Sequence, residues 1–304
     1  MSNAKRVVSR RDTLAVAGAL SIAAATGFPL ASSAVAAPVP ELVAPSLIPS
    51  EAQHLKALTE RLAKAPRRRE FKTVPMILTN PEQWDYEALN EVLNYEPPFK
   101  QAANNVDIAG SVLNSMRGTI SAEVWAFKHL DFLAVFATHG SAQLALYDQA
   151  TWDKYQLTRL AGEKFKNNTL IEDTKAASHN PADIQDQAGV YSPGNTTIPA
   201  MMRRGGVFLA CHNAAWEQAG ALLAAGINPD HLTHNELAAD LTNHFIPRVI
   251  VTPAIVATLS DASGQAARST RWSISLRSVA KSMGLVRSAS APFSSDLRFV
   301  SASP

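Results

Sequence analysis

Three short apolar runs, each followed by a stretch with helical periodicity, constrain the fold more than any other feature of the sequence. The runs span residues 130–137, 207–210 and 248–251. They are continuous rather than alternating, which is typical of strands that are buried on both faces. Because strands and helices alternate with short connections, we predict an α/β fold with a mainly parallel sheet covered by helices.

Capping residues and apolar periodicity predict where several helices begin and end. Asn80 followed by Pro81 opens one helix, and the pair Thr233 and Glu236 opens another. Gly226 suits the left-handed position that follows a helix. Further predictions concern longer segments: helices over 50–64, 108–127 and 214–225, and a polar surface loop over 171–199.

The charge distribution argues against a nucleic-acid-binding domain. Of 28 basic and 26 acidic residues, ten basic and two acidic ones lie in the end segments 1–37 and 262–304. The region between them keeps 18 basic and 24 acidic residues, so its formal charge is −6. Nucleic-acid-binding surfaces are instead basic, and we expect no nucleic-acid partner. The single cysteine, Cys211, excludes an intrachain disulfide and any cysteine-rich metal site.

Residues 1–37 have the order of segments found in a bacterial export signal. Arg10 and Arg11 precede an apolar, alanine-rich run, and small residues of the A-x-A type follow at 34–37. The paired arginines mark the twin-arginine variety. A membrane anchor is the alternative, but the run is short for a span and Pro29 interrupts it. We therefore expect the twin-arginine export machinery as a partner, a soluble periplasmic protein after cleavage, and no stable membrane span in the mature form.

The rest of the chain divides into three parts by composition. Residues 38–70 form a proline-rich spacer and a short helix, ending in a basic triplet, 67–69, that is either a solvated face or a docking patch. The globular domain is predicted over 71–261. Residues 262–304 hold twelve serines and six basic residues without a strong apolar period. This composition predicts a disordered tail.

Segments at the predicted strand ends carry a resemblance to a known family. They read FLAVFATHG over 132–140, VFLACHNA over 207–214 and IPRVIVTPAIVA over 246–257. In combination they are similar to the DsrE/DsrF-like family, and the helix with Trp84 and the segment 146–148 resemble its exported branch. The resemblance covers about residues 74–259. It implies a flavodoxin-like three-layer sandwich that often forms homo-oligomers. In the sulfur-relay members a cysteine after a central strand carries a persulfide, and Cys211 matches that position.

Cys211 is the candidate catalytic residue on independent grounds. It follows a predicted strand at the carboxyl edge, where ligands collect in doubly wound sheets. The start of the next helix would favour a thiolate, as would His139 or His212 if either lies close. A lone thiolate can accept and pass on sulfur, but it cannot complete an internal redox cycle. The alternative is an inert core cysteine.

Binding or tuning roles are assigned to His139, Gly140, His212 and Asn213 at the same predicted edge. Gly140 would let a ligand approach the backbone, although a histidine in such a turn commonly only hydrogen-bonds a neighbouring carbonyl. No cofactor is implied. We predict no metal site, because the histidines at 231–244 are spread along a predicted helix and its start.

Two functions from different classes remain open. The first is sulfur relay or thiol handling through Cys211, sulfurtransferase-like if it is enzymatic, with a sulfur donor or acceptor protein as partner. The second is a non-catalytic, oligomeric ligand-binding or scaffold role in the periplasm. Thiol reactivity discriminates them, because an inert, buried Cys211 fits only the second.

Overall fold

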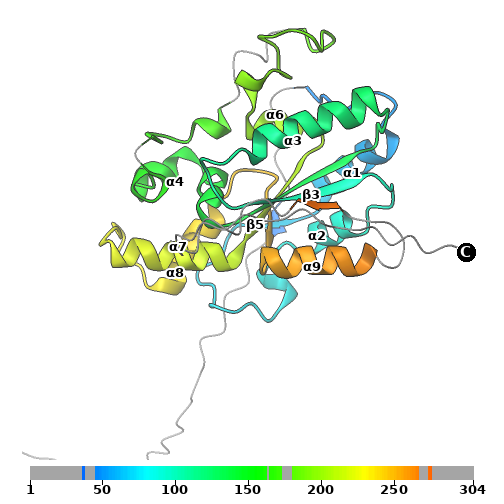
Figure 1. Ribbon diagram of the computed structural model, residues 1–304. Helices are drawn as coiled ribbons and strands as arrows, with labels where there is room; N and C mark the ends of the chain where they lie inside the picture. The colour runs from blue at the N-terminus through cyan, green and yellow to red at the C-terminus, as the bar shows by residue number, and fades with distance from the viewer. Residues whose placement is uncertain (1–35, 38–44, 163, 173–179, 267–272, 276–304) are drawn as a thin grey trace, which may run out of the picture. The chain divides into compact units, whose positions relative to one another are not determined.

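The computed structural model describes residues 36–37, 45–162, 164–172, 180–266 and 273–275 (Figure 1). The predicted export signal at 1–37, apart from its last two residues, and the segment after 275 lie outside the described residues. Those last two residues form β1 (Ala36–Ala37), which pairs antiparallel with β2 (Arg67–Arg68). In the part of the chain described here, no helix is long and apolar enough to cross a membrane.

A parallel sheet forms the centre of the described region. Its strands follow the order β6-β5-β4-β3-β7, and each neighbouring pair is parallel. The strands are β3 (Lys100–Asn105), β4 (Leu133–Thr138), β5 (Val207–Cys211), β6 (Ile250–Thr252) and β7 (Ser273–Ser275). The predicted α/β class with a parallel sheet is therefore confirmed.

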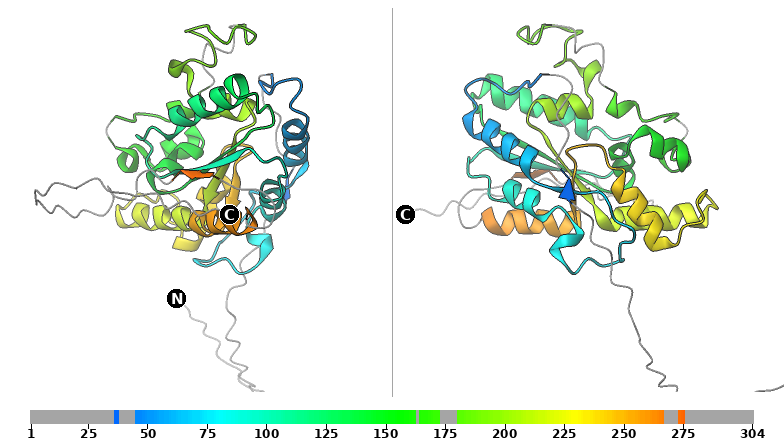
Figure 2. Two further views of the ribbon diagram at one scale, coloured as in Figure 1. Left: turned by 45° about the vertical axis from the view of Figure 1, so that its right-hand side comes forward. Right: turned by 180° about the vertical axis from the view of Figure 1, so that it is seen from behind.

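Helices cover both faces of this sheet and make three layers (Figures 1 and 2). Successive residues of β4 alternate between two apolar clusters, with Phe136 in the first and Val135 in the second. The first cluster contains apolar residues of α3 (Val112–Ser121), α4 (Gln149–Lys154), α6 (Ile198–Arg203), α7 (His212–Ala224) and α8 (His234–Asn243). The second contains those of α1 (Gln53–Lys64), α2 (Tyr86–Leu93) and α9 (Ile255–Ala266).

The predicted caps are confirmed. Asn80 and Gln83 form a capping box around the short helix η1 (Pro81–Gln83), and α2 follows it. Thr233 and Glu236 form the predicted box at the start of α8. Gly226 lies two residues after the end of α7 with φ +69°. The long helix predicted over 108–127 begins at Val112 and continues into the π-helical turn η2 (Ala122–Ala126).

The two outer strands on one side of the sheet were not predicted. β3 reads KQAANN, and its polar composition hides a strand that pairs with β4 along its whole length. β7 pairs with β3 through three residues within the segment for which a disordered tail was predicted. Three residues of the predicted tail thus form a strand, because backbone pairing to the open edge of β3 needs no apolar pattern.

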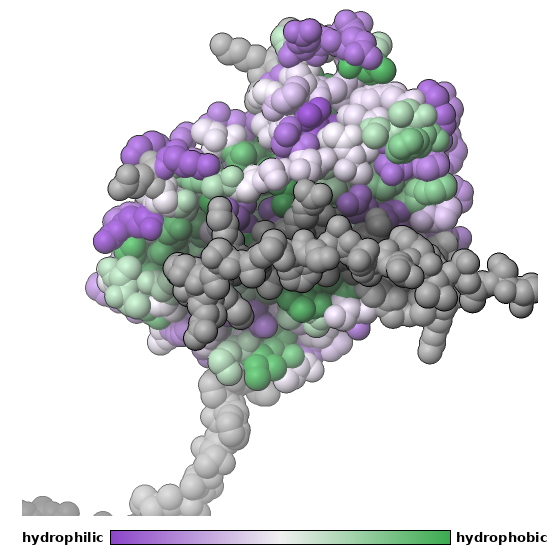
Figure 3. Space-filling view, in the orientation of Figure 1, coloured by the Kyte–Doolittle hydropathy of each residue, from purple (hydrophilic) through white to green (hydrophobic). Residues whose placement is uncertain are grey.

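Residues 74–79, a short apolar run just before the cap at Asn80, form a loop. Met76 and Ile77 are 56% and 66% exposed in the loop before α2. Figure 3 shows a patch of hydrophobic residues at the lower margin of the face it draws. The predicted loop at 171–199 contains short 3-10 turns at Thr169–Ile171 and Pro193–Asn195, and its residues 173–179 lie outside the described ones.

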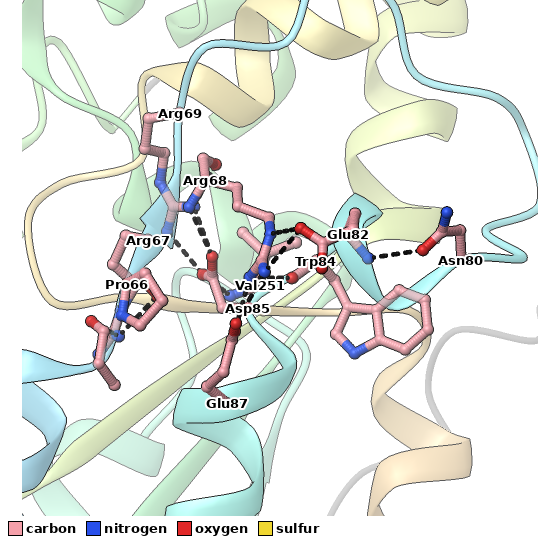
Figure 4. A network of polar contacts seen from close by, with 11 residues as sticks. Pro66, Arg67, Arg68, Arg69, Asn80, Glu82, Trp84, Asp85, Glu87 and Val251 are labelled. Carbon is pink, nitrogen blue, oxygen red and sulfur yellow. Dashed lines mark hydrogen bonds and ion pairs between the residues drawn. The ribbon is translucent and has the colours of Figure 1, made fainter. Parts of the chain in front are cut away.

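The basic triplet at 67–69 is neither a solvated face nor a docking patch, so both predictions for it were wrong. Arg67 and Arg68 are 5% and 2% exposed. The Arg68 guanidinium makes ion pairs of 2.7 Å to Glu87 and 3.0 Å to Glu82 (Figure 4). Carboxylates in and just before α2 compensate the charge of the buried guanidinium group. The sequence around the triplet shows only a run of basic residues, and such a run favours a position at the surface.

Asp85 joins this network to the sheet. Its carboxylate is 0% exposed and lies 3.0 Å from the Arg69 guanidinium. The same carboxylate accepts backbone N–H bonds from Arg68 at 2.9 Å and from Val251 at 2.8 Å. Asp85 therefore ties the segment before α2 to β6 (Figure 4).

Candidate functional site

The candidate residues lie at the carboxyl edge of two neighbouring strands, as predicted. Thr138 of β4 pairs with Ala210 of β5, so His139 and Cys211, which follow these two residues, lie at the same edge. Cys211 also immediately precedes α7. The prediction that β4 and β5 bring these residues to one edge of the sheet is confirmed.

The Cys211 side chain is buried in one of the two apolar layers that flank the sheet. Cys211 is 6% exposed and belongs to the apolar cluster that includes Ala214, Ile250 and Ile255. This follows from strand alternation, because Leu209 and Cys211 face the same layer. The thiol therefore belongs to the apolar layer between the sheet and α9, although it is near enough to the Tyr147 hydroxyl to help raise its pKa.

A chain of hydrogen bonds connects the backbones at the two strand ends. The Cys211 N–H donates to Gln143 Oε1 at 2.7 Å, and Gln143 Nε2 lies 3.4 Å from the Tyr147 hydroxyl. That hydroxyl donates to Gln218 Oε1 at 2.8 Å, and Gln218 Nε2 donates to the Gly140 carbonyl at 2.9 Å. Burial raises the pKa of Tyr147, which keeps its phenol protonated as a donor. The network fixes the backbone of the two turns.

Neither histidine provides a cation beside the thiol. His139 Nε2 lies 2.8 Å from Asn104 Oδ1, and His212 Nε2 lies 2.8 Å from the Pro75 carbonyl. Burial lowers the pKa of both rings, with Glu217 opposing the shift at His139 and backbone contacts opposing it at His212. Both imidazoles therefore favour the neutral form, which does little to stabilise a thiolate.

Gly140 lies against a neighbouring turn, whereas Asn213 is exposed. Gly140 has φ +57°, and a Cβ atom there would lie 2.7 Å from the Val106 carbonyl oxygen. Gly140 therefore permits the close approach of the two turns, and its predicted role in ligand binding stays a prediction. Asn213 is exposed, and its side chain makes no hydrogen bond with the residues that the structure describes.

A polar cavity opens at the same edge, beside β3. It measures about 350 Å³ and is lined by β3 from Gln101 onward, by the turn after β3, and by α3 from Val112 to Thr119. Gln101, Ser111 and Ser115 line it, and their side chains make no hydrogen bond with described residues. Asn104 also lines it and is joined to His139. The cavity therefore offers unsatisfied donors and acceptors that are mostly uncharged.

The position of the cavity is set by the topology of the sheet. β3 lies between β4 and β7. The connection from β3 to β4 runs through α3 on one face, whereas α9, which precedes β7, packs on the other face. The direction of strand order therefore reverses at β3. Ligands in open α/β sheets bind outside the carboxyl ends of the strands at such a reversal.

The histidines considered for a metal site have other partners. His234 Nε2 lies 2.8 Å from the Trp216 carbonyl, and His244 Nδ1 lies 2.7 Å from the Asp240 carbonyl. His231 has φ +55° in the turn before α8. Among the described residues, no group of three or more His, Cys, Asp or Glu side chains could hold a metal ion.

Comparison with family models, with curated proteins and with solved structures gives no match to this chain. Its function is therefore inferred from its own geometry.

The cavity residues were missed by the sequence analysis. Gln101 and Asn104 belong to β3, whose polar composition gives no strand signal. The network residues Gln143 and Gln218 come from two helical segments that only the folded chain brings together. The serines at 111 and 115 are four residues apart on one helical face, which is a weak signal that the sequence does contain.

Proposed function

We propose that the chain is an exported, DsrE/DsrF-like protein that binds a small, neutral, hydroxyl-rich molecule without chemical turnover. The resemblance of the strand ends and the twin-arginine pattern support the family and the export route. The three-layer arrangement with a parallel sheet is of the kind that the resemblance implies. A homo-oligomer stays a prediction.

The observation that carries this proposal is the polar cavity at the reversal of strand order. Its free hydrogen-bonding side chains are neutral, and its one carboxylate, Asp107, already accepts a 2.9 Å bond from the Ala109 N–H. Uncharged amides and hydroxyls suit a ligand with several hydroxyl groups better than an ion. About 350 Å³ accommodates a molecule the size of a sugar or a short polyol.

The environment of Cys211 favours this proposal over sulfur relay. A persulfide carrier needs an accessible sulfur and a group that stabilises its thiolate. Cys211 is 6% exposed and packs among apolar side chains, and its two neighbouring histidines favour the neutral form. Sulfur relay stays the competing prediction, and it requires α9 to move away from the thiol.

Isothermal titration calorimetry with a panel of neutral sugars and polyols tests the proposal. We expect at least one to bind the full chain, and Ser115→Leu to weaken that binding by roughly tenfold or more by filling the cavity. Asn114→Leu is the matched control, because Asn114 is exposed on the same helix but does not line the cavity. Binding that Ser115→Leu leaves unchanged, or no binding across the panel, would contradict the proposal.

A further inference from the structure

A second cavity lies at the opposite, amino-terminal edge of the sheet. It measures about 510 Å³. Its walls come from the start of α1, from the loop between α2 and β3, and from the loop between η2 and β4. The two cavities share no lining residue, although Gln101 of the other cavity follows Phe99 of this one by only two residues. It is not part of the site described above.

Exposed aromatic rings mark this edge. Phe99 and His129 both line the cavity, and their rings stack with centroids 3.4 Å apart and an interplanar angle of 8°. Phe127 lies beside His129, with ring centroids 6.1 Å apart. Phe99 is 45% exposed and Phe127 62% exposed. Large aromatic rings are normally buried, so two exposed ones around one histidine indicate a contact surface.

The aromatic rings are held in place by the chain around them. His129 Nδ1 lies 2.6 Å from Glu123 Oε2, and the His129 N–H donates to the Glu123 carbonyl at 2.9 Å. The Phe99 carbonyl accepts from the Leu133 N–H at 3.1 Å, which anchors it to the start of β4. Lys128 adopts φ +62°, a left-handed conformation that is rare outside glycine and occurs at functional turns. The stacked platform is therefore preformed.

Carboxylates give the cavity its charge. Glu51, Glu96 and Asp131 line it, against one lysine, Lys128. Asp131 Oδ1 accepts from the Leu55 N–H at 2.9 Å, so its carboxylate is oriented by the start of α1. Glu96 is exposed and makes no ion pair or hydrogen bond with the described residues. A flat aromatic platform beside an excess of carboxylates is complementary to a positively charged, planar group.

We propose that this cavity binds a planar organic cation, whose ring lies against Phe99 and whose charge faces Glu96. The aromatic face attracts the cation through its quadrupole, and the carboxylate supplies the counter-charge. This site is independent of the proposed ligand site at the carboxyl edge.

Titration calorimetry with benzamidine, a planar aromatic cation, tests this site on the full chain. The neutral analogue benzamide and the anion benzoate have nearly the same shape. We expect benzamidine to bind at least roughly tenfold more tightly than either analogue. Equal binding of benzamidine and benzamide, or no benzamidine binding at millimolar concentrations, would overturn the proposal.

Variants locate the binding. Phe99→Leu, which keeps an apolar side chain but removes the ring, is expected to weaken benzamidine binding roughly fivefold, and Glu96→Gln roughly threefold or more. Glu60→Gln is the matched control, because Glu60 is exposed on α1 and does not line the cavity. Ser115→Leu, which fills the other cavity, is expected to leave benzamidine binding unchanged. A loss in Glu60→Gln or Ser115→Leu as large as that in Glu96→Gln would assign the binding elsewhere and overturn the proposal.

Discussion

At the residue scale, Asp85 connects separate parts of the chain through a carboxylate that solvent does not reach. It pairs with Arg69 and accepts backbone bonds from β2 and β6, while its own N–H donates to the Val251 carbonyl at 3.2 Å. Removing one partner of a buried pair leaves an uncompensated charge and unsatisfied backbone donors. The side chain therefore holds the start of α2 to the sheet.

We predict that Asp85→Ala lowers the free energy of unfolding by about 3–5 kcal/mol, measured by urea denaturation. The control is Glu91→Ala, which removes an exposed ion pair with Arg61. This variant should change the free energy of unfolding by less than about 1 kcal/mol. Similar losses of unfolding free energy in the two variants would show that the buried network around Asp85 does not stabilise the fold more than an exposed ion pair does.

At the element scale, continuous apolar runs were sufficient to predict the central strands. The runs at 130–137, 207–210 and 248–251 contain all but the last residue of β4, β5 and β6, because these strands are buried on both faces. β3 and β7 were not predicted, because they join the sheet by backbone pairing and their sequences show no apolar pattern. The caps at Asn80 and Thr233 were predictable because they depend on neighbouring residues alone.

The candidate site was predictable in part for the same reason. Strand ends place His139 and Cys211 at one edge, and the sequence shows where the strands end. Which face the Cys211 side chain takes depends on register and on α9, and the cavity depends on a strand that the sequence conceals. Long-range packing therefore determines the part of the site that sequence patterns do not show.

The turn after β4 offers a prediction about the same edge. Gly140 and Gly226 both have positive φ, but only at Gly140 would a Cβ atom meet the backbone of another turn. Gly226→Ala is expected to lower the free energy of unfolding by about 1 kcal/mol, because alanine is strained in the left-handed conformation. Gly140→Ala is expected to lower the free energy of unfolding by about 1–3 kcal/mol more than Gly226→Ala does, because the Val106 carbonyl must move to make room for the added Cβ atom. Equal losses in thermal or urea unfolding would contradict the close approach of the two turns.

At the scale of the whole molecule, stability should depend on pH through the buried histidines. Burial lowers the pKa of His139 and His212 in the folded chain, so below the unfolded pKa the unfolded chain binds more protons. The free energy of unfolding should therefore fall between about pH 7 and pH 5. His212→Gln, which retains a donor for the Pro75 carbonyl, should reduce this slope in urea titrations. An unchanged slope in His212→Gln and in His139→Gln would show that these rings do not set the dependence.

The two edges of the sheet have contrasting chemistry. The carboxyl edge presents neutral hydrogen-bonding groups in a cavity between β3 and α3, and the amino-terminal edge presents aromatic rings and carboxylates. The thiol lies in neither cavity lining. A protein with this arrangement is suited to hold small molecules at separate sites, with Cys211 as part of the packing.

The central claim is that the carboxyl edge binds a neutral ligand and that Cys211 carries no sulfur. Native mass spectrometry tests both halves at once, on the wild type, Ser115→Leu and Cys211→Ser, each exposed to the sugar and polyol panel and then to a polysulfide donor. The account predicts a reversible ligand adduct that persists in Cys211→Ser and is lost in Ser115→Leu, with no covalent sulfur in any form. A covalent gain of sulfur that is reversed by reductant and absent only from Cys211→Ser would contradict it and establish Cys211 as the carrier.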